Sequence, residues 1–510
     1  MLRRTRVENG ILQGIPSGDP RITVYKGVPY AAPPVGELRW KAPQPVKNWE
    51  GVRMADRFAP IAPQGQQGVN WAEFYTKEIH PCGYELEMSE DCLYLNVWTP
   101  AMSDSERLPV FFWIHGGGLS GGYSYEMEFD GERVARKGCV VVSIAYRLGG
   151  LGFFAHDDLD EEEPGCAQGN FGLLDQAAAI AWAKRNIAAF GGDPDRIVIA
   201  GQSAGGRSVT ALMTSPMTKN LISGAILMSG GGIAPSRTLA DAKEEGRQLL
   251  RALDVNSVDE ARRLPADLII KTMEGLRARP GAVKNRSTVC IDGVFLQEDP
   301  TDVILGNRLP NIPYLFGFCH DEGFSFFRRS VPETMAAFEE KIRAEYGEHA
   351  ERFFELAGVH SDEELAKLYG SEEFHPFYMS HGCLARVLAE QGRPAYMYMF
   401  DHDMPGDDVG SYHGSDLWFF FDALNRCWRP FAGKHYDLAR QVCRYVVNFC
   451  ATGDPNGADH DGAPLPRWDG YTEQAPMMMV FGDVPEQRRA PVEGELTRLR
   501  QEQFMGRLKK

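Results

Sequence analysis

The chain has 510 residues, of which 43% are hydrophobic and 24% are charged, a composition typical of a globular protein that buries a large core. Its formal net charge of −16 argues against a nucleic-acid binder, which would carry a basic surface. We interpret the excess of acidic residues as a feature that keeps the protein soluble. No run of about 18 apolar residues occurs in the sequence, so we expect no transmembrane helix.

The ten cysteines are spread singly, without a Cys-x-x-Cys pair, which argues against a zinc site, a redox motif or a disulfide scaffold. The basic N-terminal residues 1–6 run into Glu8, Asn9 and Gly10 rather than into an apolar stretch, so we expect no secretory signal. These features favour a cytoplasmic enzyme with reduced thiols, although a chain whose leader had been removed would have the same features.

Three segments in the first third of the chain predict strands: 93–98, 110–114 and 140–145. The last two are continuous apolar runs, as in strands that helices cover on both faces. The periodicity then changes. Residues 172–190 are rich in alanine and leucine and predict a helix, which the sequence Gly191-Gly192-Asp193-Pro194 should end.

Strands and helices alternate from there on. The pattern predicts a strand at 196–200, a helix at 204–213 and a strand at 225–228, and further strands at 313–318 and 395–400. This alternation predicts an α/β fold with a mostly parallel, doubly wound sheet and right-handed crossovers.

Two helical segments, approximately 239–290 and 332–391, interrupt this alternation. Because they lie between strands, we interpret them as lids over the carboxyl edge of the sheet. The chain is then a single domain that spans residues 1–510.

Gly201-Gln202-Ser203-Ala204-Gly205 matches Gly-x-Ser-x-Gly, the pattern of a nucleophilic serine exposed on a sharp strand-to-helix turn. Ser120, between Gly118 and Gly122, fits the same pattern. Ser203 follows a strand-like run and precedes a helix-forming stretch, whereas glycines and small polar residues surround Ser120. The context favours Ser203 as the nucleophile and makes Ser120 a loop residue.

The sequence His115-Gly116-Gly117-Gly118 follows a predicted buried strand. Acyl transfer needs N–H donors aimed at the oxygen that becomes negatively charged, and backbone amides in a glycine run are open to substrate. A plain flexible turn would have the same composition. The combination of this run with the downstream Ser203 motif is more specific than either feature alone.

A serine nucleophile of this kind is followed along the chain by an acid and then by a histidine. Asp321 and Glu322 both follow the strand at 313–318, and spacing does not choose between them. His413 lies in a glycine-containing loop after the strand at 395–400. Position alone leaves other downstream histidines as competitors: His381, His402 and His435.

Further motifs span nearly the whole chain, and with them the sequence resembles the type B carboxylesterases, the family of cholinesterases and bacterial p-nitrobenzyl esterases. The matching segments, in family order, are 90–96 (Glu-Asp-Cys-Leu-Tyr-Leu-Asn), 113–118, 169–176 (Gly-Asn-Phe-Gly-Leu-Leu-Asp-Gln), 190–195, 200–206, 320–323 (His-Asp-Glu-Gly) and 413–416 (His-Gly-Ser-Asp).

The resemblance implies an α/β-hydrolase catalytic domain and assigns roles that spacing leaves open. It assigns Glu322 as the acid, His413 as the general base for Ser203, and an oxyanion hole formed by Gly117, Gly118 and Ala204. It also implies a serine carboxylesterase that works through an acyl-enzyme intermediate, without a metal or an organic cofactor.

Two departures from the family pattern bear on substrate and compartment. Most relatives have glutamate before the nucleophile, whereas this chain has Gln202. Secreted relatives bridge the cysteine that corresponds to Cys92 to one well upstream, whereas here no cysteine precedes Cys82. Cys82 itself falls where cholinesterases carry a choline-binding tryptophan. We therefore expect no such disulfide, and little preference for choline esters.

These observations predict a hydrolase of neutral short-chain or aryl esters, with a small-molecule ester as its partner and no nucleic acid. The alternatives are an amidase or thioesterase with the same triad, and a non-catalytic cholinesterase-like interaction protein. The sequence makes no prediction of oligomeric state.

Overall fold

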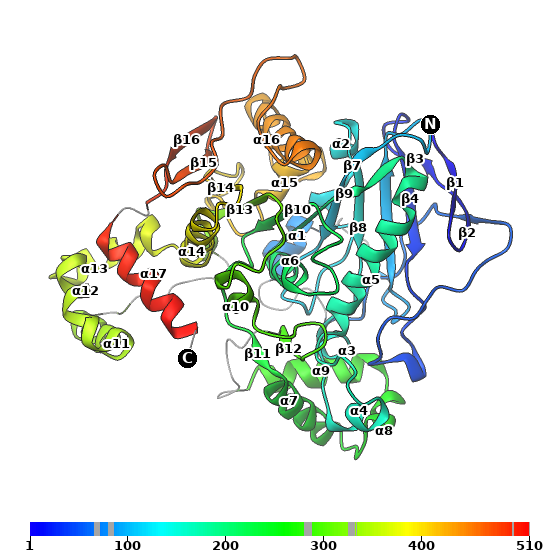
Figure 1. Ribbon diagram of the computed structural model, residues 1–510, viewed down its shortest axis with the longest axis horizontal. Helices are drawn as coiled ribbons and strands as arrows, with labels where there is room; N and C mark the ends of the chain where they lie inside the picture. Colours follow the sequence, from blue (N-terminus) through cyan, green and yellow to red (C-terminus); the bar gives the residue numbers. More distant parts are fainter. Residues whose placement is uncertain are drawn as a thin grey trace.

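The computed structural model describes residues 1–65, 72–79, 86–279, 288–324, 332, 334–491 and 494–508, and Cys82 lies outside these ranges. Within them, eleven strands form one twisted sheet in the order β16-β15-β14-β13-β10-β9-β7-β8-β6-β4-β3 (Figure 1). The strands from β15 to β8 in this order pair in parallel, and antiparallel strands complete both edges. The predicted mostly parallel α/β sheet is confirmed.

The strands of this sheet are mostly short and buried. Their bounds are β3 (Ile15–Pro16), β4 (Thr23–Pro29), β6 (Tyr94–Thr99), β7 (Leu108–Ile114), β8 (Val140–Ile144), β9 (Gly192–Gln202), β10 (Gly224–Met228), β13 (Tyr314–Cys319), β14 (Ala395–Phe400), β15 (Met477–Phe481) and β16 (Pro485–Arg489). Two smaller sheets contain β1 (Arg4–Val7), β2 (Gly10–Gln13) and β5 (Val52–Met54), and β11 (Arg237–Thr238) and β12 (Cys290–Ile291).

Helices surround the main sheet. Their bounds are α1 (Ala72–Ile79), α2 (Glu132–Arg136), α3 (Gly149–Gly152), α4 (Asp157–Glu162), α5 (Phe171–Asn186), α6 (Ala204–Thr214), α7 (Leu239–Ala252), α8 (Val258–Arg262), α9 (Ala266–Arg277), α10 (Pro300–Leu305), α11 (Met335–Tyr346), α12 (Ala350–Ala357), α13 (Asp362–Gly370), α14 (Pro376–Glu390), α15 (Leu417–Phe420), α16 (Gly433–Thr452) and α17 (Glu495–Leu508).

The central strands are apolar throughout because each contributes side chains to two cores. Successive side chains of a strand point to opposite faces. In β7, Val110, Phe112 and Ile114 join the core beneath α5 and α6. Phe111 and Trp113 join the opposite core, with residues of α15 and α16. This two-sided burial is the reason that a continuous apolar run, rather than an alternating one, marked this strand.

The predicted helix at 172–190 is α5 followed by a 3₁₀ turn, Ile187–Phe190. The turn ends at Gly191, which adopts φ 78° and ψ 9°, a left-handed conformation that glycine adopts without the penalty of a Cβ. Strand β9 begins at the next residue, so Pro194 lies inside the strand and does not end the helix.

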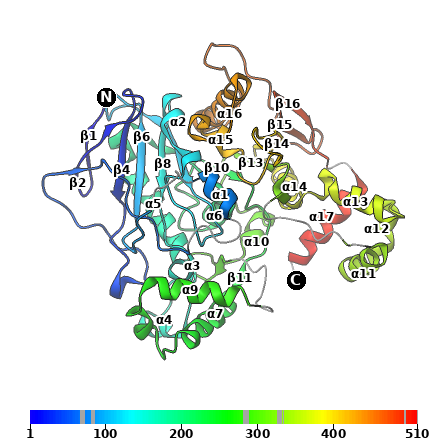
Figure 2. The ribbon, with the colours of Figure 1, turned by 180° about the vertical axis from the view of Figure 1, so that it is seen from behind.

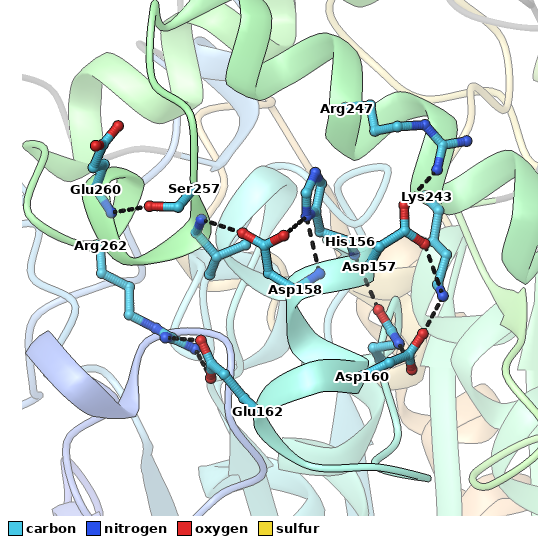
Figure 3. Close-up of polar contacts among 12 residues, drawn as sticks. His156, Asp157, Asp158, Asp160, Glu162, Lys243, Arg247, Ser257, Glu260 and Arg262 are labelled. Atoms are coloured by element: carbon cyan, nitrogen blue, oxygen red, sulfur yellow. Dashed lines mark hydrogen bonds and ion pairs between the residues drawn. The ribbon is translucent and has the colours of Figure 1, made fainter.

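The first helical insertion contains α7, α8 and α9, which pack near α4 at one end of the molecule (Figures 1 and 2). Acidic side chains of α4 form ion pairs with basic side chains of α7 and α8 (Figure 3). Asp157 pairs with Lys243 at 3.1 Å and with Arg247 at 2.7 Å. Arg262 of α8 donates to Glu162 at 2.8 Å. Because several of these side chains are partly exposed, each pair contributes at most about 1 kcal/mol.

The second insertion, at 332–391, contains α11 to α14. Helices α11 to α13 pack with the C-terminal helix α17 around a small core of their own, at the opposite end of the molecule from β1 (Figures 1 and 2). Helix α14 contacts α17 as well, and it also packs on β13 and β14 of the main sheet. The interpretation of both insertions as lids within one domain stays a prediction.

No helix among the described residues is long and apolar enough to span a membrane. The nine described cysteines are all free thiols, and Cys92 is completely buried. Burial raises the pKa of the Cys92 thiol far above its ordinary value, which keeps the thiol protonated and unreactive.

We predict that the nine described cysteines react with a thiol reagent when the protein is denatured without reductant. Native protein should leave the buried thiols, including Cys92, unlabelled. Peptide mapping after thiol blocking provides the measurement. A peptide crosslinked through Cys92, to Cys82 or to any other cysteine, would contradict the prediction.

Candidate active site

Ser203 lies at the turn between β9 and α6, at the carboxyl edge of the parallel sheet. Its backbone adopts φ 56° and ψ −121°, a conformation that L-residues rarely adopt and that costs about 1–3 kcal/mol. Its N–H donates to the carbonyl oxygen of Met228 in β10 at 2.8 Å. The turn is therefore held in its strained form by the neighbouring strand.

The two glycines of the motif are required by close backbone contacts. A Cβ on Gly201 would lie 2.4 Å from the carbonyl carbon of Gly205, and a Cβ on Gly205 would lie 2.2 Å from the carbonyl oxygen of Ile114. Any larger residue at either position would push α6 away from β7 and β9. The pattern in the sequence thus reflects how closely helix and strands approach.

The glycine run after β7 forms a loop beside Ser203. Gly117 and Gly118 have φ values of 94° and 67°, and a Cβ on Gly117 would meet the carbonyl oxygen of Gly121 at 2.2 Å. Gln64 holds this loop from outside: its side chain accepts from the N–H of Gly122 at 2.9 Å and donates to the carbonyl oxygen of Gly122 at 3.0 Å. Sequence reasoning did not identify Gln64.

His413 and Glu322 are brought together from different parts of the chain. Glu322 is fully buried just after β13, and its Oε2 pairs with Nδ1 of His413. The other carboxylate oxygen accepts the N–H of Cys319 at 3.0 Å. The Gln202 amide nitrogen lies 3.2 Å from His413 Nε2, and since this amide group can only donate, Nε2 acts as acceptor there. This arrangement fits the tautomer with its proton on Nδ1, facing Glu322.

Spacing in the sequence could not show which acid and which histidine are catalytic. In the structure, the candidates for each role have different environments. Asp321 accepts from the N–H of Ser411 at 2.9 Å and pairs with His320, whose hydrogen bond lowers the pKa of Asp321 to about 2. Asp321 therefore braces the loop that carries His413. The other histidines lie elsewhere: His381 contacts the Gly230 carbonyl, His402 Nδ1 lies 3.3 Å from Asp483, and His435 contacts the backbone in the first turn of α16.

Ser120 lies in the turn that closes the glycine loop, with its hydroxyl 3.5 Å from the Gly117 carbonyl oxygen. Ala204 is the first residue of α6, directly after Ser203. Ser203, His413, Gly117, Gly118 and Ser120 all line one pocket of about 350 Å³. Of the expected site residues, Ser203, His413, Gly117 and Gly118 thus line one cavity, while Ala204 follows Ser203 and Glu322 lies behind His413.

The rest of the pocket comes from segments that sequence reasoning did not connect to the site. Aromatic and aliphatic side chains form much of its wall, together with three glutamates: Tyr75, Glu78, Ile79, Glu126, Glu128, Phe129, Tyr412, Leu417 and Trp418. Tyr412 and Leu417 lie close to His413 in the sequence, so proximity to that motif was an available signal. The residues of α1 offered no such signal.

Two hydrogen bonds join helix α1, which contributes to the pocket wall, to the loop that carries His413. The Tyr75 hydroxyl donates to the His413 carbonyl oxygen at 2.9 Å, and the Tyr412 hydroxyl donates to Glu78 Oε2 at 2.7 Å. Arg429 also holds α1 in place, through a buried ion pair with Glu78 at 2.8 Å. These contacts couple the position of the pocket wall to the position of His413.

Glu126 and Glu128 lie against each other on the segment after the glycine loop. Burial raises the pKa of Glu126 to about 7. Burial and the neighbouring Glu126 charge raise the pKa of Glu128 well above its ordinary value. The pair therefore retains at least one proton near neutral pH, because two adjacent buried carboxylates repel each other.

The described residues contain one group close enough together to hold a metal ion, namely Asp459, His460 and Asp461. They lie on the loop between α16 and β15 and do not line the pocket. Asp459 already pairs with Arg440. We assign this group no role in the site.

The raised pKa of Glu126 predicts a pH-dependent stability. The unfolded chain ionises this carboxyl near its ordinary pKa of 4.5, whereas the folded protein keeps it protonated up to about pH 7. Between these values the folded state binds more protons, so its stability falls as pH rises, by up to about 3 kcal/mol. We predict that Glu126→Gln gains stability relative to wild type between pH 5 and pH 8, measured as the difference in Tm. Parallel Tm curves for the two proteins would contradict the raised pKa.

Comparisons with known proteins agree with this geometry. A sequence model described as the carboxylesterase family matches residues 3–496. The chain is 32% identical over 491 residues to fumonisin B1 esterase of Sphingopyxis macrogoltabida, covering 93% of this chain and 85% of the relative. It is 33% identical over 478 residues to para-nitrobenzyl esterase of Bacillus subtilis (strain 168), covering 90% of each.

Comparison with solved structures also shows similarity to carboxylesterases. A PNB esterase structure superimposes with a TM-score of 0.81 at 28% identity, over 98% of this chain and 99% of the other. The carboxylesterase EST55 of Geobacillus stearothermophilus superimposes with a TM-score of 0.77 at 30% identity, over 98% and 99%. The chain belongs to the carboxylesterase family and is a carboxylic ester hydrolase with an α/β-hydrolase fold.

Proposed function

We propose that Ser203, His413 and Glu322 form the catalytic triad of this ester hydrolase. The observation that carries the proposal is the pairing of His413 Nδ1 with the buried Glu322, beside a serine on a strained strand-to-helix turn. A buried carboxylate in this position holds the imidazole in the required tautomer and stabilises its protonated form. Asp321, which braces the loop, is not available for that role.

The proposed reaction has two stages. His413 Nε2 takes the Ser203 proton as the hydroxyl attacks the ester carbonyl, and the imidazolium then protonates the departing alcohol. Water hydrolyses the acyl-enzyme by the same route. The backbone N–H groups of Gly117, Gly118 and Ala204 are the proposed donors to the oxyanion in both stages.

In the resting arrangement Gln202 donates to the same nitrogen that must accept the Ser203 proton. A glutamate there would instead place a negative charge beside the imidazole. We infer that the loss of this charge disfavours choline esters and leaves neutral short-chain or aryl esters as the preferred substrates. The name of para-nitrobenzyl esterase, which denotes an aromatic ester, supports this choice.

We further propose a cytoplasmic location. The support is that the nine described cysteines are free, since secreted proteins of this size commonly carry disulfides. A disulfide between Cys82 and Cys92 would contradict this location, because disulfides form and persist in oxidising compartments.

We predict that Ser203→Ala lowers kcat for p-nitrophenyl butyrate by about 10³-fold or more, because it removes the nucleophile and leaves only binding and oxyanion stabilisation. Ser120→Ala, which alters a serine in the same pocket, should retain most activity. Comparable losses in the two variants would show that Ser203 is not the nucleophile.

We also predict different effects for the two adjacent carboxylates. Glu322→Gln should lower kcat on the order of 10³-fold, because an amide cannot stabilise the imidazolium. Asp321→Asn should lower kcat less than about tenfold, since it only loosens the brace on Ser411. Measurement of kcat and KM for both variants decides the assignment, and the reverse ranking would refute it.

A further inference from the structure

Arg207, near the start of α6, is a half-buried cation without a direct partner. Its side chain forms no hydrogen bond and no ion pair within the part of the chain that the structure describes. Burial lowers the pKa of its guanidinium, and the charge of Asp299 acts on it only from beyond ion-pair distance. Because a guanidinium stays protonated in proteins, the charge of Arg207 persists without a partner in contact with it.

Two buried arginines elsewhere in the molecule have the arrangement that is usual for structural ion pairs. Arg147 donates to both oxygens of Asp175, at 2.6 and 2.7 Å. Arg429 donates to both oxygens of Glu78, at 2.8 and 3.2 Å. A charge that is removed from water needs such a partner, because its desolvation is otherwise uncompensated. Arg207 lacks one, so its donors are available to a bound molecule.

The guanidinium of Arg207 is also accessible. None of its nitrogens belongs to the completely buried side-chain atoms that lack a partner, so each nitrogen keeps some accessible surface. The oxygens of Asp299 are already used: they accept the backbone N–H of Ser236 at 3.2 Å and of Thr301 at 2.8 Å, and the second contact caps α10. Asp299 therefore gives long-range compensation only, and a second anion can approach the guanidinium.

Arg207 lies one helical turn behind Ser203. Its backbone N–H donates to the Ser203 carbonyl oxygen at 3.1 Å. The two residues thus lie on the same face of α6, about 6 Å apart along the helix axis. Side chains on a helix lean toward its N-terminus, so the long Arg207 side chain extends back toward the turn that carries Ser203. A group a few bonds away from the reacting carbonyl is within its reach.

The cavity beside Ser203 accommodates only one part of a bound ester. Its lining includes His413 and Gln202 but neither Ala204 nor Arg207. In the proposed reaction His413 protonates the departing alcohol, so the alcohol part lies on the His413 side, in the cavity. The acyl part leaves the carbonyl carbon in another direction. The side of Ser203 that the cavity does not occupy is the side of Ala204 and Arg207.

We propose that Arg207 binds a carboxylate on the acyl part of the substrate, so that the enzyme prefers monoesters of dicarboxylic acids to esters of simple fatty acids. The guanidinium presents a fork of N–H donors that matches the two oxygens of a carboxylate. A neutral acyl chain leaves that fork without a partner. The proposal rests on the proposed function, because Ser203 and His413 determine which side receives the acyl part. It specifies the acyl part, whereas the discrimination against choline esters concerns the alcohol part.

The test compares two substrates that differ in one charge: 4-nitrophenyl hydrogen adipate and 4-nitrophenyl methyl adipate. At pH 7.5 the free carboxyl group of the first is ionised, since its ordinary pKa is about 4. With rates corrected for hydrolysis without enzyme, we expect kcat/KM about tenfold or more higher for the acid, as for a charge-assisted hydrogen bond. The gain should appear in KM, because a carboxylate remote from the carbonyl is bound equally in the ground and transition states.

Variants of Arg207 separate recognition of the carboxylate from a role in folding. Arg207→Gln should reduce the preference for the acid to unity or below, with kcat and KM for the methyl ester unchanged, which shows an intact fold. Arg207→Lys keeps the charge without the fork and should retain part of the preference. Arg263→Gln, which removes an exposed arginine at the end of α8, is the matched control for net charge and should keep the full preference.

A second substrate pair places the charge on the alcohol part: 4-carboxyphenyl butyrate and its methyl ester. Arg207→Gln should leave the ratio of their kcat/KM values unchanged. Loss of methyl adipate turnover in Ser203→Ala tests the proposed nucleophile separately. Equal kcat/KM for the two adipates in wild type, or a preference that Arg207→Gln leaves unchanged, would overturn the proposal. A gain that depends on Arg207 only in the alcohol-side pair would overturn it as well.

Discussion

The backbone of Ser203 is held in a conformation that L-residues rarely adopt, and the packing of the surrounding elements depends on that turn. Gly205 lies against the carbonyl oxygen of Ile114, and a Cβ on Gly230 would lie 2.0 Å from the carbonyl oxygen of Ser203. Strand β7, helix α6 and the loop after β10 therefore meet at one point. The glycine loop after β7 is placed beside the serine by the same contacts. The sheet order reverses here, with β8 on one side of β7 and β9 on the other, which is where open α/β sheets bind ligands.

Buried acids dominate the electrostatics around this turn, and each has a different environment. Glu322 is paired with His413, and Glu78 with Arg429. Burial raises the pKa of Asp416 to about 6, while the Tyr398 hydroxyl donates to Asp416 at 2.7 Å. Glu126, next to Glu128, has its own contact to the glycine loop. The net charge of the chain does not predict the electrostatics of this site, because the charge of each buried carboxylate depends on its own hydrogen-bond and ion-pair partners.

The sequence could predict the elements that are defined locally. The apolar runs at 110–114 and 140–145 correspond to β7 and β8, since strands covered on both faces need no polar residue for several positions. The Ser203 turn was equally recognisable, because its geometry demands glycines at fixed spacing. The strand-to-helix alternation then placed these turns at the carboxyl edge of one sheet, and resemblance chose Glu322 and His413 among the candidates.

The pocket wall could not be predicted, because it is assembled from distant segments. In the sequence, Glu78 resembles an ordinary surface acid on a short helix. Its buried contact with Arg429, 351 positions further along the chain, is known only from the structure. In the sequence, Glu126 and Glu128 resemble solvent-exposed charges in a loop. Only the structure shows that both side chains are buried and lie against each other. Strands β15 and β16 were also missed, since a run such as Met477–Phe481 does not reveal that its neighbour is β14.

We propose that Ser203, on its strained turn and with His413 and Glu322 behind it, is the activated nucleophile. A fluorophosphonate probe reports that property directly, because it phosphonylates activated serines irreversibly and its site of attachment can be mapped by mass spectrometry of peptides. The account predicts stoichiometric labelling at Ser203, with the labelling rate strongly reduced in Glu322→Gln. Labelling at Ser120 or at another serine, or no labelling of the folded wild-type protein, would contradict it.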